Sequence, residues 1–480
     1  MSDHESGSPP SSPSEIEPES APEERRIDLT TGGLARGIFG LVWPIMLASL
    51  LSTLPWFADQ VMVGRLVGDA TRGAAAVGMS GKLIFVVMVI AMAITTGAQV
   101  LISRSMGARD TATAERAAGQ AFIILGLVVG GVLLPFGYWA APWLLLQTGA
   151  TPEMLEVGTP YLRFMFLAGP GMLTNFLFAS CLQGAGDSRT PLYLSGGVNI
   201  LNVVLNWILI FGNLGAPAMG VTGAAVGTFL ARSIGAVFAI GALSSGRLAL
   251  RIHWLTALRL DFGIWWRILR VGIPSGLQGF VRAISGWAIF YILGKCANAT
   301  DVIGGYTISD QIMMLTSFIG FAAMPAAMTV VGQNVGANQL DRAERGGWAV
   351  MKLAGGLMCI PAALYFVAAP GWLRLVAPEA TVEAQAIGAI ALRILCLGEA
   401  SWAINMALGG ALRGGGDTIS PLVLTVATQL LLGVGVGAVL VLGFGMGPEA
   451  LWGATLVSMW IQTALTIWWY RRGRWKSLSV

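Results

Sequence analysis

The chain has 480 residues, of which 55% are hydrophobic and only 11% are charged. About 25% of residues are charged in soluble globular domains, so this composition excludes an ordinary soluble protein. The net charge of +4 requires no nucleic-acid partner, because membrane proteins concentrate Lys and Arg in cytoplasmic loops. With two histidines and four cysteines that form no CxxC pair, we expect no transition-metal site and no cofactor.

The chain begins with a polar segment that is rich in Ser, Pro and Glu, over residues 1–33. A segment with so little apolar content cannot bury enough surface to fold, so we expect a disordered acidic tail there.

Apolar runs of about twenty residues then recur along the chain, and each is long enough to cross the hydrocarbon core as a helix. Because no water is available to the backbone there, the predicted fold class is an all-α polytopic membrane protein. The twelve predicted transmembrane helices cover residues 37–64, 74–102, 117–140, 157–180, 191–212, 219–243, 266–294, 303–331, 347–372, 384–411, 420–444 and 449–470.

Lys and Arg gather before the first span, after spans 2, 6 and 8, and after the last span. This asymmetry predicts that both termini are cytoplasmic, in a multi-pass protein of the cell (cytoplasmic or inner) membrane.

The sequence also repeats at an offset of about 230 residues. At this shift CLQGAGDSRTP (181–191) falls on ALRGGGDTISP (411–421), and Pro44 falls on Pro274. Each half has an even number of spans, so we expect a parallel repeat of two pseudo-symmetric six-helix bundles around a central cleft. The predicted units are an N-terminal lobe (34–243), a basic cytoplasmic connector (244–265), a C-terminal lobe (266–472) and a cytoplasmic tail (473–480).

Two similar bundles around a cleft favour a transporter, because they can rock between two open states. A polytopic membrane enzyme is an alternative from another class. The sequence contains no HExxH, no GxSxG and no phosphate-binding loop with a following Lys, so neither catalysis nor direct use of ATP is expected.

Asp59 lies near the end of the first span. A charge at membrane depth is costly, and such residues commonly mark ion or substrate pathways. The alternative is a carboxylate at a helix end that simply reaches water.

Polar residues in spans 5 and 6 could complete a cation site with Asp59. Asn202 and Asn206 share one helical face with Asn199 one turn back, and Ala224 and Thr228 are four residues apart. Oxygen ligands of this kind suit a small hard cation, whereas a buried carboxyl group could instead hold a proton. Hydrogen bonding between helices is the structural alternative for the Asn pair.

Several segments resemble the multidrug and toxic compound extrusion (MATE) family, over about residues 36–470. They are WPIMLASLLSTLPWFADQVMVGRLVG (43–68), TTGAQVLISRSMGA (95–108), QGAGDSRTPL (183–192), LNVVLNW (201–207), GVTGAAVGT (220–228), VGIPSGLQ (271–278) and TVVGQNVGA (329–337). The resemblance implies cation-coupled antiport, in which Na⁺ or H⁺ enters while an amphipathic, often cationic, organic compound leaves. It places the family's N-lobe cation site on Asp59, Asn202, Asn206, Ala224 and Thr228. Relatives sometimes carry Asp at the position of Asn206, so Asp59 would be the single carboxylate of this site.

The C-terminal lobe departs from the family pattern. Many relatives carry a Glu eight residues after the Pro of GxP, where this chain has Arg282, and Trp402 stands where some relatives have Asp. A second acidic coupling site is therefore not expected. Our hypothesis is that Asp310 or Glu399 neutralises Arg282, because an unpaired buried Arg is costly. The alternative is an Arg that snorkels or faces a water-filled cleft.

Lys82 is predicted at a depth similar to that of Asp59. One hypothesis is a Lys82–Asp59 ion pair that breaks on cation binding, and the alternative is a Lys that snorkels to the interface. Polar candidates for the substrate cleft are Gln278, Gln311 and Asn405.

The sequence thus predicts a monomeric cation-coupled (H⁺ or Na⁺) antiporter that exports organic compounds by alternating access, with membrane lipid as its surroundings. A flippase or exporter of a lipid-linked precursor or polar metabolite is the nearest alternative, since Arg282 and Lys82 would suit a basic cleft. The two lobes differ at the coupling position, because Ile289 stands 230 residues after Asp59.

Overall fold

The computed structural model describes residues 27–64, 70–147 and 151–478, without the side chains of 56–57, 60, 64, 70–77, 82 and 153. Most of these residues are helical, and no strand occurs among them. The first half contains α1 (Leu34–Gly64), α2 (Ala70–Gly107), α3 (Thr111–Ile124), α4 (Leu134–Gln147), α5 (Pro152–Gly184), α6 (Arg189–Phe211) and α7 (Gly220–Ser244). The second half contains α9 (Phe262–Leu293), α10 (Ala299–Met314), α11 (Phe318–Gly336), α12 (Leu340–Val376), α13 (Val382–Cys396), α14 (Glu399–Gly414), α15 (Ile419–Thr425) and α16 (Pro448–Arg472).

The predicted transmembrane helices are confirmed in number and type. Among the described residues, eleven helices or helix runs are long and apolar enough to cross a membrane. The pair α13 and α14, bent by 42°, makes up to twelve. Two of these runs change pitch, because π-helical segments at Leu125–Leu133 and Val426–Val436 continue α3 and α15. The crossings are therefore close to those that hydropathy predicts, although several helices extend beyond the predicted ends.

Two helix breaks were not predicted. Span 8 is divided into α10 and α11, and span 10 into α13 and α14, whereas α2 and α5 are continuous in the first half. At the first break the hydroxyls of Thr316 and Ser317 donate to the carbonyl of Met313, at 3.1 and 3.2 Å. Such bonds compete with the helical pattern of the backbone and are missed by hydropathy.

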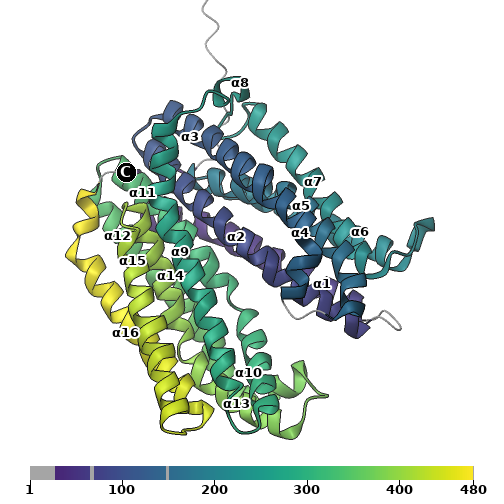
Figure 1. Cartoon of the computed structure of the whole chain (residues 1–480). Helices are drawn as coiled ribbons and strands as arrows, with labels where there is room; N and C mark the ends of the chain where they lie inside the picture. The colour runs from purple at the N-terminus through teal and green to yellow at the C-terminus, as the bar shows by residue number, and fades with distance from the viewer. Residues whose placement is uncertain (1–26, 65–69, 148–150, 479–480) are drawn as a thin grey trace, which may run out of the picture.

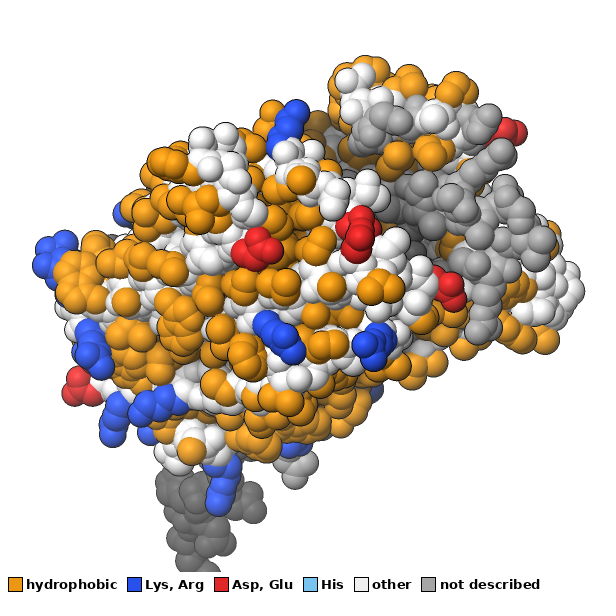
Figure 2. Space-filling model, turned by 90° about the horizontal axis from the view of Figure 1, so that it is seen from below, with side chains coloured by type: hydrophobic (Ala, Val, Ile, Leu, Met, Phe, Trp, Pro, Cys, Tyr) orange, Lys and Arg blue, Asp and Glu red, His pale blue; other side chains and the backbone are white. Residues whose placement is uncertain are grey.

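The two halves converge at one end, which we call the joined end, and spread apart at the other, which we call the spread end (Figure 1). They converge where α2 packs against both α9 and α11, and the outer ends of α4 and α10 diverge (Figure 1). Seen from below the view of Figure 1, the surface is mostly apolar with scattered charged side chains (Figure 2). A largely apolar exterior is what a protein surrounded by lipid tails requires.

Equivalent positions of the two halves meet where α2 and α11 cross. A Cβ on Gly107 would overlap the carbonyl oxygen of Gln333, and a Cβ on Gly336 would overlap that of Arg104. Gln99 donates to the hydroxyl of Thr329 at 3.2 Å, and these two positions are 230 residues apart. The reciprocal contacts are those of a pseudo-two-fold axis, as the sequence repeat predicts.

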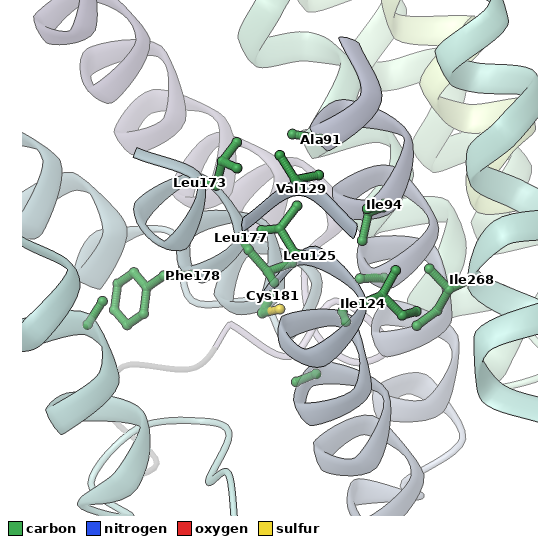
Figure 3. Close-up of a cluster of buried hydrophobic side chains, with 14 of the residues drawn as sticks. Ala91, Ile94, Ile124, Leu125, Val129, Leu173, Leu177, Phe178, Cys181 and Ile268 are labelled. Atoms are coloured by element: carbon green, nitrogen blue, oxygen red, sulfur yellow. The ribbon is translucent and has the colours of Figure 1, made fainter. Parts of the chain in front are cut away.

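The hydrophobic core of the first half includes one side chain of the second. Leu125 and Val129 of the π-helical continuation of α3 are buried together with Leu177 and Cys181 of α5 (Figure 3). Ile268 of α9 is fully buried in the same cluster. The joined end therefore has a continuous apolar core as well as polar contacts.

The two terminal segments of the chain each contact the opposite half at the joined end. We expected disorder up to residue 33, but Leu29 is only 1% exposed and its carbonyl accepts bonds from Arg342 (2.9 Å) and Asn334 (3.3 Å) of the second half. At the other terminus, Arg104 of α2 donates to the carbonyl of Leu478 at 2.9 Å. We call these two contacts the terminal straps.

The connector between the halves is shorter than predicted. It runs from residue 245 to 261 and contains the short helix α8 (Trp254–Ala257). Gln120 of α3 donates to the carbonyls of Ala257 and Arg259, both at 2.8 Å, and accepts from the indole of Trp265. One buried amide thereby fixes the connector to the first half.

Candidate functional site

Asp59 lies near the C-terminal end of α1 and is half-buried. Helix α1 packs against α6, and Asn206 of α6 donates its amide Nδ2–H to Asp59 Oδ1 at 2.5 Å. The carboxylate is therefore turned toward another helix of the same half.

The other predicted oxygen ligands continue this hydrogen-bonded chain. Asn202 Nδ2 donates to Asn206 Oδ1 at 3.4 Å and to the hydroxyl of Thr228 at 3.1 Å. Asn202 and Asn206 reach the same place because they are four residues apart on α6. Ala224 is buried one turn before Thr228, in a cluster that includes Val63 of α1. The structure thus brings Asp59, Asn202, Asn206 and Thr228 together, with Ala224 beside them.

Asn206 needs a glycine opposite it. A Cβ on Gly227 of α7 would overlap Asn206 Oδ1 and lie 3.1 Å from the Asn206 backbone nitrogen. Sequence reasoning missed this residue, although it lies inside the GAAVGT segment. Gly227 allows α6 and α7 to approach closely enough for the Asn202–Thr228 bond.

Asn199 has a structural role in this arrangement. Pro55 has no backbone N–H, so the carbonyl of Leu51, four residues earlier in α1, loses its helical partner. Asn199 Nδ2 donates to that carbonyl at 3.0 Å. The predicted accessory ligand therefore attaches α6 to the proline-containing part of α1, whereas Asn206 is the residue that donates to Asp59.

Two further residues near Asp59 were missed. Arg232 of α7 interacts electrostatically with Asp59, without a salt bridge between them among the described residues, and its Nε has no hydrogen-bond partner. Tyr161 of α5 is buried within range of the same charge. Arg232 is four residues after Thr228, so helical spacing alone could have found it. The side chain of Lys82 lies outside the described residues, and the proposed Lys82–Asp59 pair stays a prediction.

Two of the polar cleft candidates in the second half are occupied by bonds between helices. Gln278 of α9 donates to the carbonyl of Pro421 (3.1 Å) and the hydroxyl of Thr425 (2.6 Å). Asn405 of α14 donates to Thr463 at 2.8 Å and accepts from Thr466 at 3.0 Å, both on α16. These contacts favour a packing role for both amides.

The two acidic candidates of the second half, Asp310 and Glu399, lie near each other. Asp310 of α10 is exposed, Glu399 at the start of α14 is buried, and the two carboxylates interact electrostatically. Glu399 Oε2 has no hydrogen-bond partner. Gln311 is exposed beside Asp310. Arg282 forms no ion pair with either acid in the described part of the chain, so the expected neutralisation does not occur in this structure.

Arg282 faces a different environment. Its Nη1 lies 3.7 Å from the sulfur of Met406, and its Nε has no partner. Arg413 of α14 interacts electrostatically with Arg282. The second half therefore holds two acids in one place and two guanidinium groups in another. No group of three His, Cys, Asp or Glu that could hold a metal ion occurs among the described residues.

Comparisons with known proteins agree with this architecture. The MatE family model matches residues 44–208 and 274–439; the two matches begin 230 residues apart, the shift found within the sequence. The probable multidrug resistance protein NorM of Thermotoga maritima is 26% identical over 93% of this chain and 94% of its own length. The multidrug resistance protein PmpM of Pseudomonas aeruginosa is 27% identical over 87% of each chain.

Among solved structures, the outward-facing conformation of a multidrug resistance MATE family transporter superposes with a TM-score of 0.87 at 23% sequence identity. The match covers 95% of this chain and 99% of that one, and it shows that the fold is shared. Since the family model covers both halves of the sequence, the chain belongs to the MatE family of multidrug efflux transporters.

Proposed function

We propose that this transporter is a cation-coupled antiporter, which exports amphipathic and often cationic organic compounds in exchange for H⁺ or Na⁺. The observation that carries the proposal is the contact between Asp59 and Asn206, which places the carboxylate of α1 on the polar face of α6. A small cation and a carboxylate-bound amide donor compete for the same oxygen. Cation binding would therefore change how α1 packs on α6.

Charge couples binding of the cation to release of the exported compound. Arg232 offsets the negative charge of Asp59 before the coupling cation binds. When H⁺ or Na⁺ occupies Asp59, this region gains a net positive charge, which repels a cationic compound bound in the same half. One cation that enters down a membrane potential releases about 2.3 kcal/mol per 100 mV, which supports a gradient of roughly fifty-fold for an exported compound without net charge. When the exported compound is itself a monovalent cation, one-for-one exchange moves no net charge, and the concentration gradient of H⁺ or Na⁺ drives it.

The membrane arrangement is also part of the proposal. Both termini would face the cytoplasm of a cell whose inner membrane holds the protein as a monomer. The joined end, which carries the terminal straps, would then face inward. The spread end, toward which Asp59 lies on α1, would face outward. Rocking of lobes 34–243 and 266–472 against each other would move the site between the two sides.

The test uses proteoliposomes with an imposed H⁺ or Na⁺ gradient and a fluorescent organic cation. We expect Asp59→Asn to abolish gradient-driven movement, whereas Glu379→Gln, in an exposed turn, should retain it. The gradient that drives the native protein identifies the coupling ion. Normal gradient-driven transport by Asp59→Asn would contradict the assignment.

An exporter of a lipid-linked precursor or polar metabolite is the second candidate. It is favoured by one observation, the presence of two guanidinium groups in the second half, at Arg282 and Arg413. Failure of the native protein to move any organic cation, with either gradient, would favour this candidate.

A further inference from the structure

Arg413 is buried without an acidic partner. It lies near the end of α14 and is 5% exposed. Nη2 donates to Gln278 Oε1, and Nη1 lies 2.9 Å from the sulfur of Met324. Nε has no partner. A neutral amide and a thioether satisfy part of the hydrogen-bonding capacity of this group but none of its charge.

Arg282 of α9 also lacks an acidic partner among the described residues. It follows Gln278 by one turn of α9, and its Nη1 contacts the sulfur of Met406 at 3.7 Å. Its Nε is also buried without a partner, and the two guanidinium groups interact electrostatically. Two like charges with unused donors therefore lie near each other, around Gln278.

This arrangement is costly unless an anion completes it. A guanidinium cannot lose its proton in a protein, and a buried charge without a partner is strongly destabilising because it is left uncompensated. Neither Arg282 nor Arg413 forms an ion pair within the described residues. Asp310 and Glu399 interact with each other. Within the part of the chain that the structure describes, no negative charge is therefore in contact with this pair.

We propose that Arg282 and Arg413 form a binding site for a carboxylate group. The planar fork of a guanidinium matches the two oxygens of a carboxylate, and both residues still have an Nε–H to donate. The carboxylate comes either from the transported compound or from a small free carboxylate that resides in the site.

The site would extend the substrate range to zwitterionic compounds. The first half presents the carboxylate of Asp59, whereas the second presents two guanidinium groups. A zwitterionic compound with an amine and a carboxylate would find an opposite charge in each half. This inference rests on the proposed function only in taking the ligand from the transported organic compounds.

The experiment measures binding to the full chain in nanodiscs, without a gradient, so that it is independent of coupling at Asp59. An amphipathic zwitterion with one carboxylate is compared with its methyl ester, by isothermal titration calorimetry. We expect the native protein to bind the acid about ten- to one-hundred-fold more tightly than the ester. Arg282→Gln and Arg413→Gln should abolish this preference, and Arg393→Gln, an Arg of α13 whose Nε contacts the carbonyl of Phe366, should retain it.

Arg413→Gln could fail to fold because Arg413 contacts Gln278 and Met324, so Arg282→Gln carries the test. Its fold is checked by gel filtration and melting temperature. Arg282→Lys should keep part of the preference, since it keeps the charge and loses the fork. Equal binding of acid and ester to the native protein would overturn the proposal, as would an undiminished acid preference in folded Arg282→Gln.

Acetate distinguishes the two sources. If acetate raises the melting temperature of the native protein but not of Arg282→Gln, and competes with the zwitterion, a small free carboxylate can occupy the site. If acetate has neither effect while the acid preference holds, the carboxylate belongs to the transported compound.

Discussion

The substitution Gly227→Ala tests the Asn206 geometry without altering any polar residue. The added methyl group would overlap Asn206 Oδ1 and lie 3.1 Å from the Asn206 nitrogen, so the side chain must move. Asn206 would lose its bond to Asp59 and the bond it accepts from Asn202. A hydrogen bond to a charged group contributes about 1.5–3 kcal/mol and a neutral one about 0.5–1.5 kcal/mol, which together give roughly 2–4 kcal/mol.

Each 1.4 kcal/mol is a factor of ten in affinity. We therefore expect the half-saturating concentration of the coupling cation to change by about ten- to one-thousand-fold in Gly227→Ala. The assay is transport in proteoliposomes at varied coupling-cation concentration. Gly241→Ala, on the same helix, is the matched control, because a Cβ there meets nothing within 4 Å. Unchanged cation dependence in folded Gly227→Ala would refute the role of Asn206.

Three further predictions concern contacts that hold the frame of the site. Asn199→Ala should lower the free energy of unfolding by about 1–3 kcal/mol, because the Leu51 carbonyl is left unpaired. The loss should be smaller in a Pro55→Ala background, where a backbone N–H is restored. Equal losses in the two backgrounds, measured by chemical denaturation, would contradict this explanation. Gln120→Ala should lower the melting temperature and speed proteolysis of the connector, and unchanged cleavage would argue against its role. Arg342→Gln should loosen the N-terminal strap and shift double electron–electron resonance distances across the joined end, while unchanged distances would exclude that effect.

The first-half site was predictable because it depends on helical spacing and one carboxylate. Asn202 and Asn206 are four apart on α6, and Ala224 and Thr228 are four apart on α7, so each pair had to share a face. Their approach to Asp59 came from the family resemblance. Spacing alone does not fix how far one helix is rotated against another.

Other features depend on contacts that a hydropathy profile does not contain. Arg413 has the sequence signature of a residue at the end of a span, where a snorkelling Arg is ordinary. Its burial follows only from the packing of α9, α11 and α14 around it. The break before α11 lies in a continuous apolar run, and hydroxyl groups at Thr316 and Ser317 decide it.

Asn199 shows what closer reading of the sequence could have achieved. A proline at position 55 necessarily frees the carbonyl of residue 51, and a buried carbonyl needs a donor. The polar face of the fifth span was the available source. The pairing with Leu51 was therefore open to prediction, although the choice among the three Asn residues was not.

The terminal straps have a consequence for how the molecule can be handled. Residue 29 is held by the second half and residue 478 by the first, so each end of the chain is mechanically attached to the half that it does not belong to. A purification tag, fluorescent protein or antibody fixed close to either strap would act on the joint between the halves and bias its opening. A small label on the exposed side chain of residue 247, in the connector, touches neither strap, and it is the better position for following the motion without steering it.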